Sequence, residues 1–130
     1  MSSTKILVVE DDADVRLGYQ VLLRAHRYQS CFAEDAALAL SAARKEQPSL
    51  IILDLGLPAG DGFVVLERLA NVPTLRQIPV IVVTARDHQK NEERALQAGA
   101  RAFIQKPWDD DALLAMIRHL LGEPALSLAR

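Results

Sequence analysis

The strongest constraint on the fold of this chain is the alternation of short apolar runs with segments of helical spacing. The apolar runs are typical of strands buried on both faces, and they occupy residues 6–9, 28–33, 50–53, 79–83 and 102–104, with 28–33 the weakest. The segments that follow predict helices over 14–27, 34–47, 87–98 and 109–121, with a short helix running from the 56–62 loop to about residue 71. The pattern therefore indicates five strand–helix repeats.

Such repeats predict one parallel sheet with helices on both faces, because each crossover between parallel strands is right-handed. For 130 residues, the expected fold class is α/β, a doubly wound five-stranded parallel sheet of the flavodoxin-like (βα)5 type with strand order 2-1-3-4-5. Gly122 is expected to end the last helix, since glycine tolerates a left-handed backbone. The predicted domain covers 1–122, and 123–130 is expected to be a tail or the start of a linker.

Composition excludes several classes of protein. The 15 basic and 17 acidic residues give a net charge of −2, which argues against a protein that coats nucleic acid or binds a membrane surface. The one cysteine, Cys31, forms no internal disulfide and suits a reducing cytoplasm. No apolar run approaches the ~18 residues of a membrane span. We therefore expect a cytoplasmic protein, and we expect this chain to bind neither nucleic acid nor a membrane.

Polar side chains follow four of the predicted strands at the point where each strand ends. These residues are Glu10, Asp11 and Asp12 after the first strand, Asp54 after the third, Thr84 at the end of the fourth, and Lys106 after the fifth. The carboxyl ends of parallel strands meet at one edge of the sheet, where ligands bind at the reversal of strand order. Grouped carboxylates without His or Cys favour Mg²⁺ over Zn²⁺, so the sequence predicts a magnesium site at this edge.

Each of these residues also has an ordinary structural explanation when it is taken alone. Asp11 or Asp12 is a suitable N-cap for the first helix, and Asp54 before Gly-Leu-Pro suits a turn. Thr84 is a suitable cap for the following helix, and Lys106 is a suitable solvated surface residue. Caps and turns do not explain why four strand ends deliver acids, a hydroxyl and an ammonium to one rim.

With this set in view, the chain resembles the receiver domains of two-component response regulators over about residues 4 to 121. The matching segments are Ile6-Leu7-Val8-Val9-Glu10-Asp11-Asp12, Leu53-Asp54-Leu55-Gly56-Leu57-Pro58 with Asp61-Gly62, Val83-Thr84-Ala85, and Lys106-Pro107. Each segment alone is a weak signal, but together in this order and spacing they are highly specific. The resemblance identifies the predicted domain, 1–122, as a receiver domain.

The resemblance implies a role for each matching residue. Asp54 is the implied acceptor of a phosphoryl group, delivered by a phosphohistidine of a sensor histidine kinase or a phosphotransfer protein. The implied Mg²⁺ ligands are Glu10, in part through water, Asp11, Asp54 and the backbone carbonyl of Gly56. Thr84 and Lys106 are the implied contacts of the phosphoryl oxygens, and the Lys106–Pro107 bond is expected to be cis. Asp12 is then left to cap the first helix.

The resemblance also implies a switch. Thr84 is expected to move toward phosphorylated Asp54 while Phe103 turns inward, which changes the surface of the fourth helix, fifth strand and fifth helix. That surface would control an output domain or partner, and it is also the implied surface for a homodimer. Phe103 stands where tyrosine is common, and Arg86 and Gly56 stand where the family tunes the access of hydrolytic water. Trp108 is expected to be a partly exposed packing aromatic.

Two alternatives come from other classes of protein. One is a receiver-like adaptor that binds partners without phosphorylation. A site that is no longer phosphorylated need not keep all of its acidic, hydroxyl and lysine residues, so their presence here counts against the adaptor. The other is a small enzyme. A flavodoxin needs a hydroxyl-rich phosphate loop where this chain has Glu10-Asp11-Asp12, and an aspartate-nucleophile phosphatase needs a second aspartate where this chain has Gly56. The function that the resemblance implies is that of a phosphoacceptor signalling domain, which catalyses only its own phosphotransfer and dephosphorylation and is not a separate enzyme.

Overall fold

The computed structural model describes residues 4–58 and 61–124, and it contains one five-stranded parallel sheet with strand order β2-β1-β3-β4-β5. The strands are β1 (Lys5–Val9), β2 (Gln29–Ala33), β3 (Leu50–Leu53), β4 (Val80–Thr84) and β5 (Ala102–Gln105). The α/β fold class and the strand order predicted from the sequence are confirmed. Register pairs Val9 with Leu53 and Leu53 with Val82, so β1 and β3 end level with each other and β4 runs two residues further, to Thr84.

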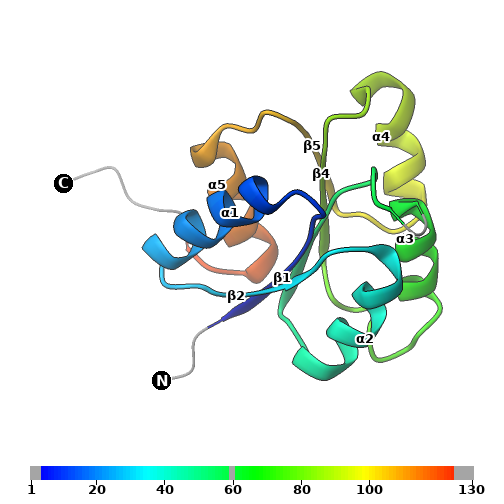
Figure 1. Ribbon diagram of the computed structural model, residues 1–130, viewed down its shortest axis with the longest axis horizontal. Coiled ribbons are helices and arrows are strands. Elements are labelled where there is room, and N and C mark those ends of the chain that lie inside the picture. The colour runs from blue at the N-terminus through cyan, green and yellow to red at the C-terminus, as the bar shows by residue number, and fades with distance from the viewer. Residues whose placement is uncertain (1–3, 59–60, 125–130) are drawn as a thin grey trace.

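Within the described residues, five helices cover the two faces of this sheet (Figure 1). They are α1 (Ala13–Ala25), α2 (Ala36–Glu46), α3 (Gly62–Ala70), α4 (His88–Gln97) and α5 (Asp110–Leu121). Helices α1 and α5 lie on one face, and α2, α3 and α4 lie on the other (Figure 1). Within residues 4–58 and 61–124, no helix combines the length and apolarity needed to cross a membrane.

The sheet divides the hydrophobic core into two clusters. Successive side chains of a strand point to opposite faces, so Leu7 and Val9 pack with α2 and α3, whereas Ile6 and Val8 pack with α1 and α5. On the second face the buried residues of α5 are Leu113, Leu114 and Ile117. Burial on both faces explains why the strands are continuous apolar runs.

Helix α4 is attached to the sheet more lightly than the other helices. Ala95 is its only fully buried residue. Its further contacts include the guanidinium of Arg94, which lies 3.8 Å from the centroid of the Phe63 ring in α3. Little apolar surface of α4 is therefore covered by the core.

The helix ends differ from the predicted ends by one or two residues, for reasons of capping. Asp12 caps α1 by accepting hydrogen bonds from two backbone amides, so the helix begins at residue 13. The same helix stops two residues before Arg27, because Arg27 has a left-handed backbone with φ 68°. Asp35 likewise delays the start of α2. Residues 59–60 of the predicted loop and 125–130 of the predicted tail lie outside the described residues.

The thiol of Cys31 provides a chemical test of the packing of β2. Burial raises its pKa to about 11 from an ordinary 9.0, so at pH 8 the folded protein should hold about a hundredfold less thiolate than the unfolded chain. We expect iodoacetamide to alkylate Cys31 correspondingly more slowly in the folded protein, with a rate that rises as pH approaches 11. Intact mass against time gives the rate, and equal rates with and without denaturant would contradict the placement of this side chain.

Candidate functional site

The carboxyl edge of the sheet holds the three buried polar side chains found within the described residues. Glu10 follows β1 and is 2% exposed, Asp54 follows β3 and is 8% exposed, and Thr84 ends β4 and is 1% exposed. Burying polar groups is unfavourable unless they are hydrogen-bonded or paired, so their concentration at one edge indicates a site and not a random arrangement.

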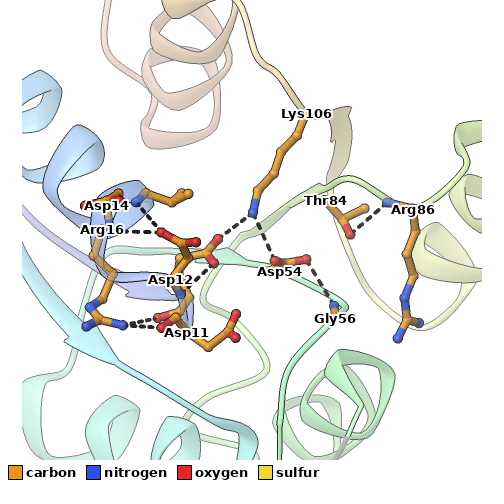
Figure 2. A network of polar contacts seen from close by, with 11 residues as sticks. Asp11, Asp12, Asp14, Arg16, Asp54, Gly56, Thr84, Arg86 and Lys106 are labelled. Atoms are coloured by element: carbon orange, nitrogen blue, oxygen red, sulfur yellow. Dashed lines mark hydrogen bonds and ion pairs between the residues drawn. The ribbon is translucent and has the colours of Figure 1, made fainter.

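Lys106 joins two of these residues. Its Nζ donates a hydrogen bond to Glu10 Oε1 at 2.6 Å and another to Asp54 Oδ2 at 3.0 Å (Figure 2). The lysine side chain is 16% exposed, so this double ion pair is largely shielded from water. The strand ends therefore bring together Glu10, Asp54 and Lys106, as the sequence predicts. The Lys106–Pro107 bond is cis, which is the geometry that the resemblance implies.

Backbone hydrogen bonds orient the two buried carboxylates. Glu10 Oε2 accepts from the amide of Asp12 at 3.1 Å, and Asp54 Oδ1 accepts from the amide of Gly56 at 3.0 Å. The guanidinium of Arg16 donates to the backbone carbonyls of Glu10 and Asp11 (Figure 2). The acidic loop after β1 is thereby fixed against the first turn of α1.

The electrostatics of the pair reflect a competition between burial and attraction. Burial raises the pKa of Glu10, and this effect outweighs the opposing hydrogen bonds from Lys106 and from the amide of Asp12. For Lys106, burial acts to lower the pKa, but the hydrogen bonds to Glu10 and Asp54 outweigh it and the net shift is upward. The ammonium is therefore charged throughout the neutral range and lies beside two carboxylates.

Three carboxylates at this edge are close enough to share one cation. Oxygens of Glu10, Asp11 and Asp54 all lie within 4.8 Å of one another, and Asp11 is the exposed member. A donor set of carboxylate oxygens open to solvent on one side suits Mg²⁺, which prefers oxygen ligands and retains several waters. The residues present thus fit the predicted metal.

Thr84 lies at the same edge but does not contact Asp54 through a hydrogen bond within the described part of the chain. Its Oγ1 accepts from the amide of Arg86 at the long distance of 3.3 Å (Figure 2). The guanidinium of Arg86 points away to Asp61, whose Oδ2 it meets at 3.0 Å. This ion pair joins the loop before α4 to the start of α3, which spacing along the chain does not reveal.

Phe103 is half-buried and packs against the cluster on the α2–α4 face. The edge of the His88 ring meets it, with ring centroids 5.8 Å apart. The contact of His88 with Phe103 was not predictable from sequence spacing, because the two residues lie on different elements. The stacked rings of Tyr19 and Trp108 form a second aromatic pair. This pair was not predictable from the sequence either, because the two residues are far apart in the chain.

Comparison with known proteins decides the family. The family model for the response regulator receiver domain matches residues 6–118 of this chain. The chain belongs to this family. The receiver domain is 41% identical over 119 residues to the response regulator PleD of Caulobacter vibrioides, covering 91% of this chain and 26% of PleD. It is 30% identical to the protein PilH of Pseudomonas aeruginosa, covering 91% of this chain and 98% of PilH.

A solved structure supports the same assignment. The receiver domain of the sensor histidine kinase PA1611 from Pseudomonas aeruginosa matches with a TM-score of 0.86 and 26% identity, covering 94% of this chain and all of that one. That structure is described as having a magnesium ion coordinated in the active site cleft. The present receiver domain spans only about a quarter of PleD, so the activity of that whole protein does not follow from the match.

Proposed function

We propose that this receiver domain accepts a phosphoryl group on Asp54, with Mg²⁺, from a phosphohistidine of a sensor histidine kinase or a phosphotransfer protein. The observation that carries the proposal is the ammonium of Lys106, held between Glu10 and Asp54 beside the cluster of three carboxylates. An adaptor that never carried a phosphoryl group would have no use for this buried arrangement, which is costly to form.

The proposed reaction is an in-line displacement. A carboxylate oxygen of Asp54 forms a bond to phosphorus while the bond from phosphorus to the imidazole nitrogen breaks, and the imidazole leaves with that electron pair. Lys106 places a positive charge where the negative charge of the phosphoryl oxygens would collect. The amide of Gly56 holds the other carboxylate oxygen of Asp54 and so orients the nucleophile.

Glu10, Asp11 and Asp54 are the side chains proposed to hold Mg²⁺, together with the backbone carbonyl of Gly56. When bound, the ion neutralises charge on the transferring group. The carboxylate cluster and the magnesium described in the related PA1611 domain both support this assignment. The proposal includes autodephosphorylation, in which water attacks the phosphorus of phosphorylated Asp54 and the carboxylate leaves.

The proposed output is a change at α4, β5 and α5. The hydroxyl of Thr84 accepts only one long hydrogen bond in the described structure, which leaves its proton available for a phosphoryl oxygen. A phosphoryl group adds about −1.5 to −2 charges, enough to draw that hydroxyl across and let Phe103 turn inward. The changed surface would then act on an output domain, a partner or a second copy of the chain. With these partners, the proposed location of the domain is the cytoplasm.

The test is incubation with acetyl phosphate and Mg²⁺, followed by intact mass measurement. We expect the mass of one phosphoryl group to be added with Mg²⁺ and none without it. No addition, together with no binding of beryllofluoride as a phosphoryl analogue, would overturn the proposal and favour the adaptor that works without phosphorylation.

A further inference from the structure

An aromatic stack joins helix α1 to the loop that carries Lys106. The rings of Tyr19 and Trp108 lie with centroids 4.3 Å apart and planes inclined by only 13°. Trp108 comes two residues after Lys106, whereas Tyr19 lies in the middle of α1. The stack is therefore a direct link between a rigid helix and the segment that positions the ammonium.

The segment around Trp108 is held at both ends by hydrogen bonds. The amide of Lys106 donates to the carbonyl of Thr84 at 2.8 Å, which ties the start of the segment to β4. The indole Nε1 of Trp108 donates to Asp110 Oδ1 at 2.8 Å, and Asp109 caps α5. Between these ends, the Trp108 ring provides the described stacking contact with α1.

Tyr19 is a firm support for that contact because its side chain is only 1% exposed. Its hydroxyl has no hydrogen-bond partner within residues 4–58 and 61–124, although burying such a group without a partner is unfavourable. Burial, followed by the charges of Glu10 and Asp54, raises the pKa of this hydroxyl, which places Tyr19 within the field of the site. What the position requires is thus an aromatic ring, not a hydroxyl that forms a bond to protein.

We propose that the stack of Tyr19 on Trp108 is a positioning device for Lys106, and this inference rests on the proposed function. The lysine has a flexible four-carbon stem, yet its Nζ reaches two carboxylates at 2.6 and 3.0 Å. Fixing the backbone next to it lowers the conformational freedom lost when both contacts form. Within the described residues, neither the Tyr19 hydroxyl nor the Trp108 indole forms a hydrogen bond to Asp54, and the proposed effect of the stack is exerted through Lys106.

The informative substitution is Tyr19→Leu, which keeps an apolar side chain but removes the stacking ring. We expect the rate of phosphorylation by acetyl phosphate to fall about three- to tenfold, the range that corresponds to loss of one aromatic pair. Affinity for Mg²⁺ should not fall, because Lys106 is not itself a proposed ligand and its ammonium competes with the ion for Glu10 and Asp54. Tyr19→Phe is the matched control, and it should keep the wild-type rate because it keeps the stack.

A double-mutant cycle separates positioning from general loss of stability. In a Lys106→Met background, adding Tyr19→Leu should cause no further loss of rate, since the group being positioned is gone. Leu40→Ala in α2 provides a variant that is destabilised on the opposite face of the sheet from the stack, and it should keep the wild-type rate at temperatures where it remains folded. An equal fall in rate with and without Lys106, or an unchanged rate in Tyr19→Leu, would overturn the inference.

A second measurement decides the inference even if the proposed function fails. Exchange of the Lys106 ammonium protons with water, followed by NMR on protein with ¹⁵N-labelled lysine, reports how firmly Nζ is held. We expect faster exchange in Tyr19→Leu than in wild type or Tyr19→Phe. Absence of phosphorylation in the wild type would reject the proposed function alone, whereas identical exchange in all three proteins would reject the positioning role.

Discussion

Asp54→Asn is expected to abolish the addition of a phosphoryl group from acetyl phosphate and Mg²⁺. An amide oxygen or nitrogen is a far weaker nucleophile than a carboxylate, and the substitution also removes one carboxylate of the cluster proposed to hold Mg²⁺. Intact mass measurement over a time course should show the added group in the wild type and none in the variant. This is the largest effect that we expect from any single substitution in the chain.

A neighbouring acid provides the control for this experiment. Asp12→Asn lies on the same edge but changes only the N-cap of α1, where asparagine caps about as well as aspartate. It should therefore be phosphorylated like the wild type. Addition of a phosphoryl group to Asp54→Asn would show that another side chain, such as Asp11, is the acceptor.

The second large effect is expected for Gly62→Ala at the start of α3. A Cβ on Gly62 would lie 2.5 Å from the backbone oxygen of Asp54 and 2.6 Å from the Cα of Leu55, closer than such atoms ever approach. The backbone that follows β3 would have to shift, and Asp54 would shift with it. We expect the free energy of unfolding to fall by about 1–3 kcal/mol, measured by urea denaturation, with slower phosphorylation.

Gly18→Ala is the matched control for that substitution. Gly18 lies within α1 and a Cβ there would meet nothing within 4 Å, so alanine should raise the free energy of unfolding by about 0.5–1 kcal/mol. The two variants are thus expected to differ in sign. A Gly62→Ala protein as stable and as reactive as the wild type would mean that the loop after Asp54 relaxes without moving the carboxylate.

The sheet and most of the site were predictable because both depend on local sequence signals. A strand buried on both faces must be apolar throughout, as in Leu50–Leu53, and so it stands out from the helices around it. The polar residue that follows each such strand then falls at a defined edge. This is why Glu10, Asp11, Asp54 and Lys106 were expected together, and the structure brings them together.

Contacts between side chains of distant elements were not predictable in the same way. The stack of Tyr19 on Trp108 depends on how α1 and the β5–α5 loop pack over one face, and no spacing in the sequence encodes that geometry. The pairing of Arg86 with Asp61 depends on two loops from different strands. The close approach of Gly62 to Asp54 is likewise a property of the folded backbone, although a glycine at the start of a helix was a signal worth following.

The light attachment of α4 has an energetic consequence for signalling. With Ala95 as its only fully buried residue, this helix has little apolar surface to expose if it shifts or opens. Its local opening should therefore have a lower free energy than opening of the helices that bury several core residues, and its backbone amides should exchange with solvent sooner. A small input of free energy at the carboxyl edge of the sheet can then change the population of α4 conformations while the rest of the domain stays folded.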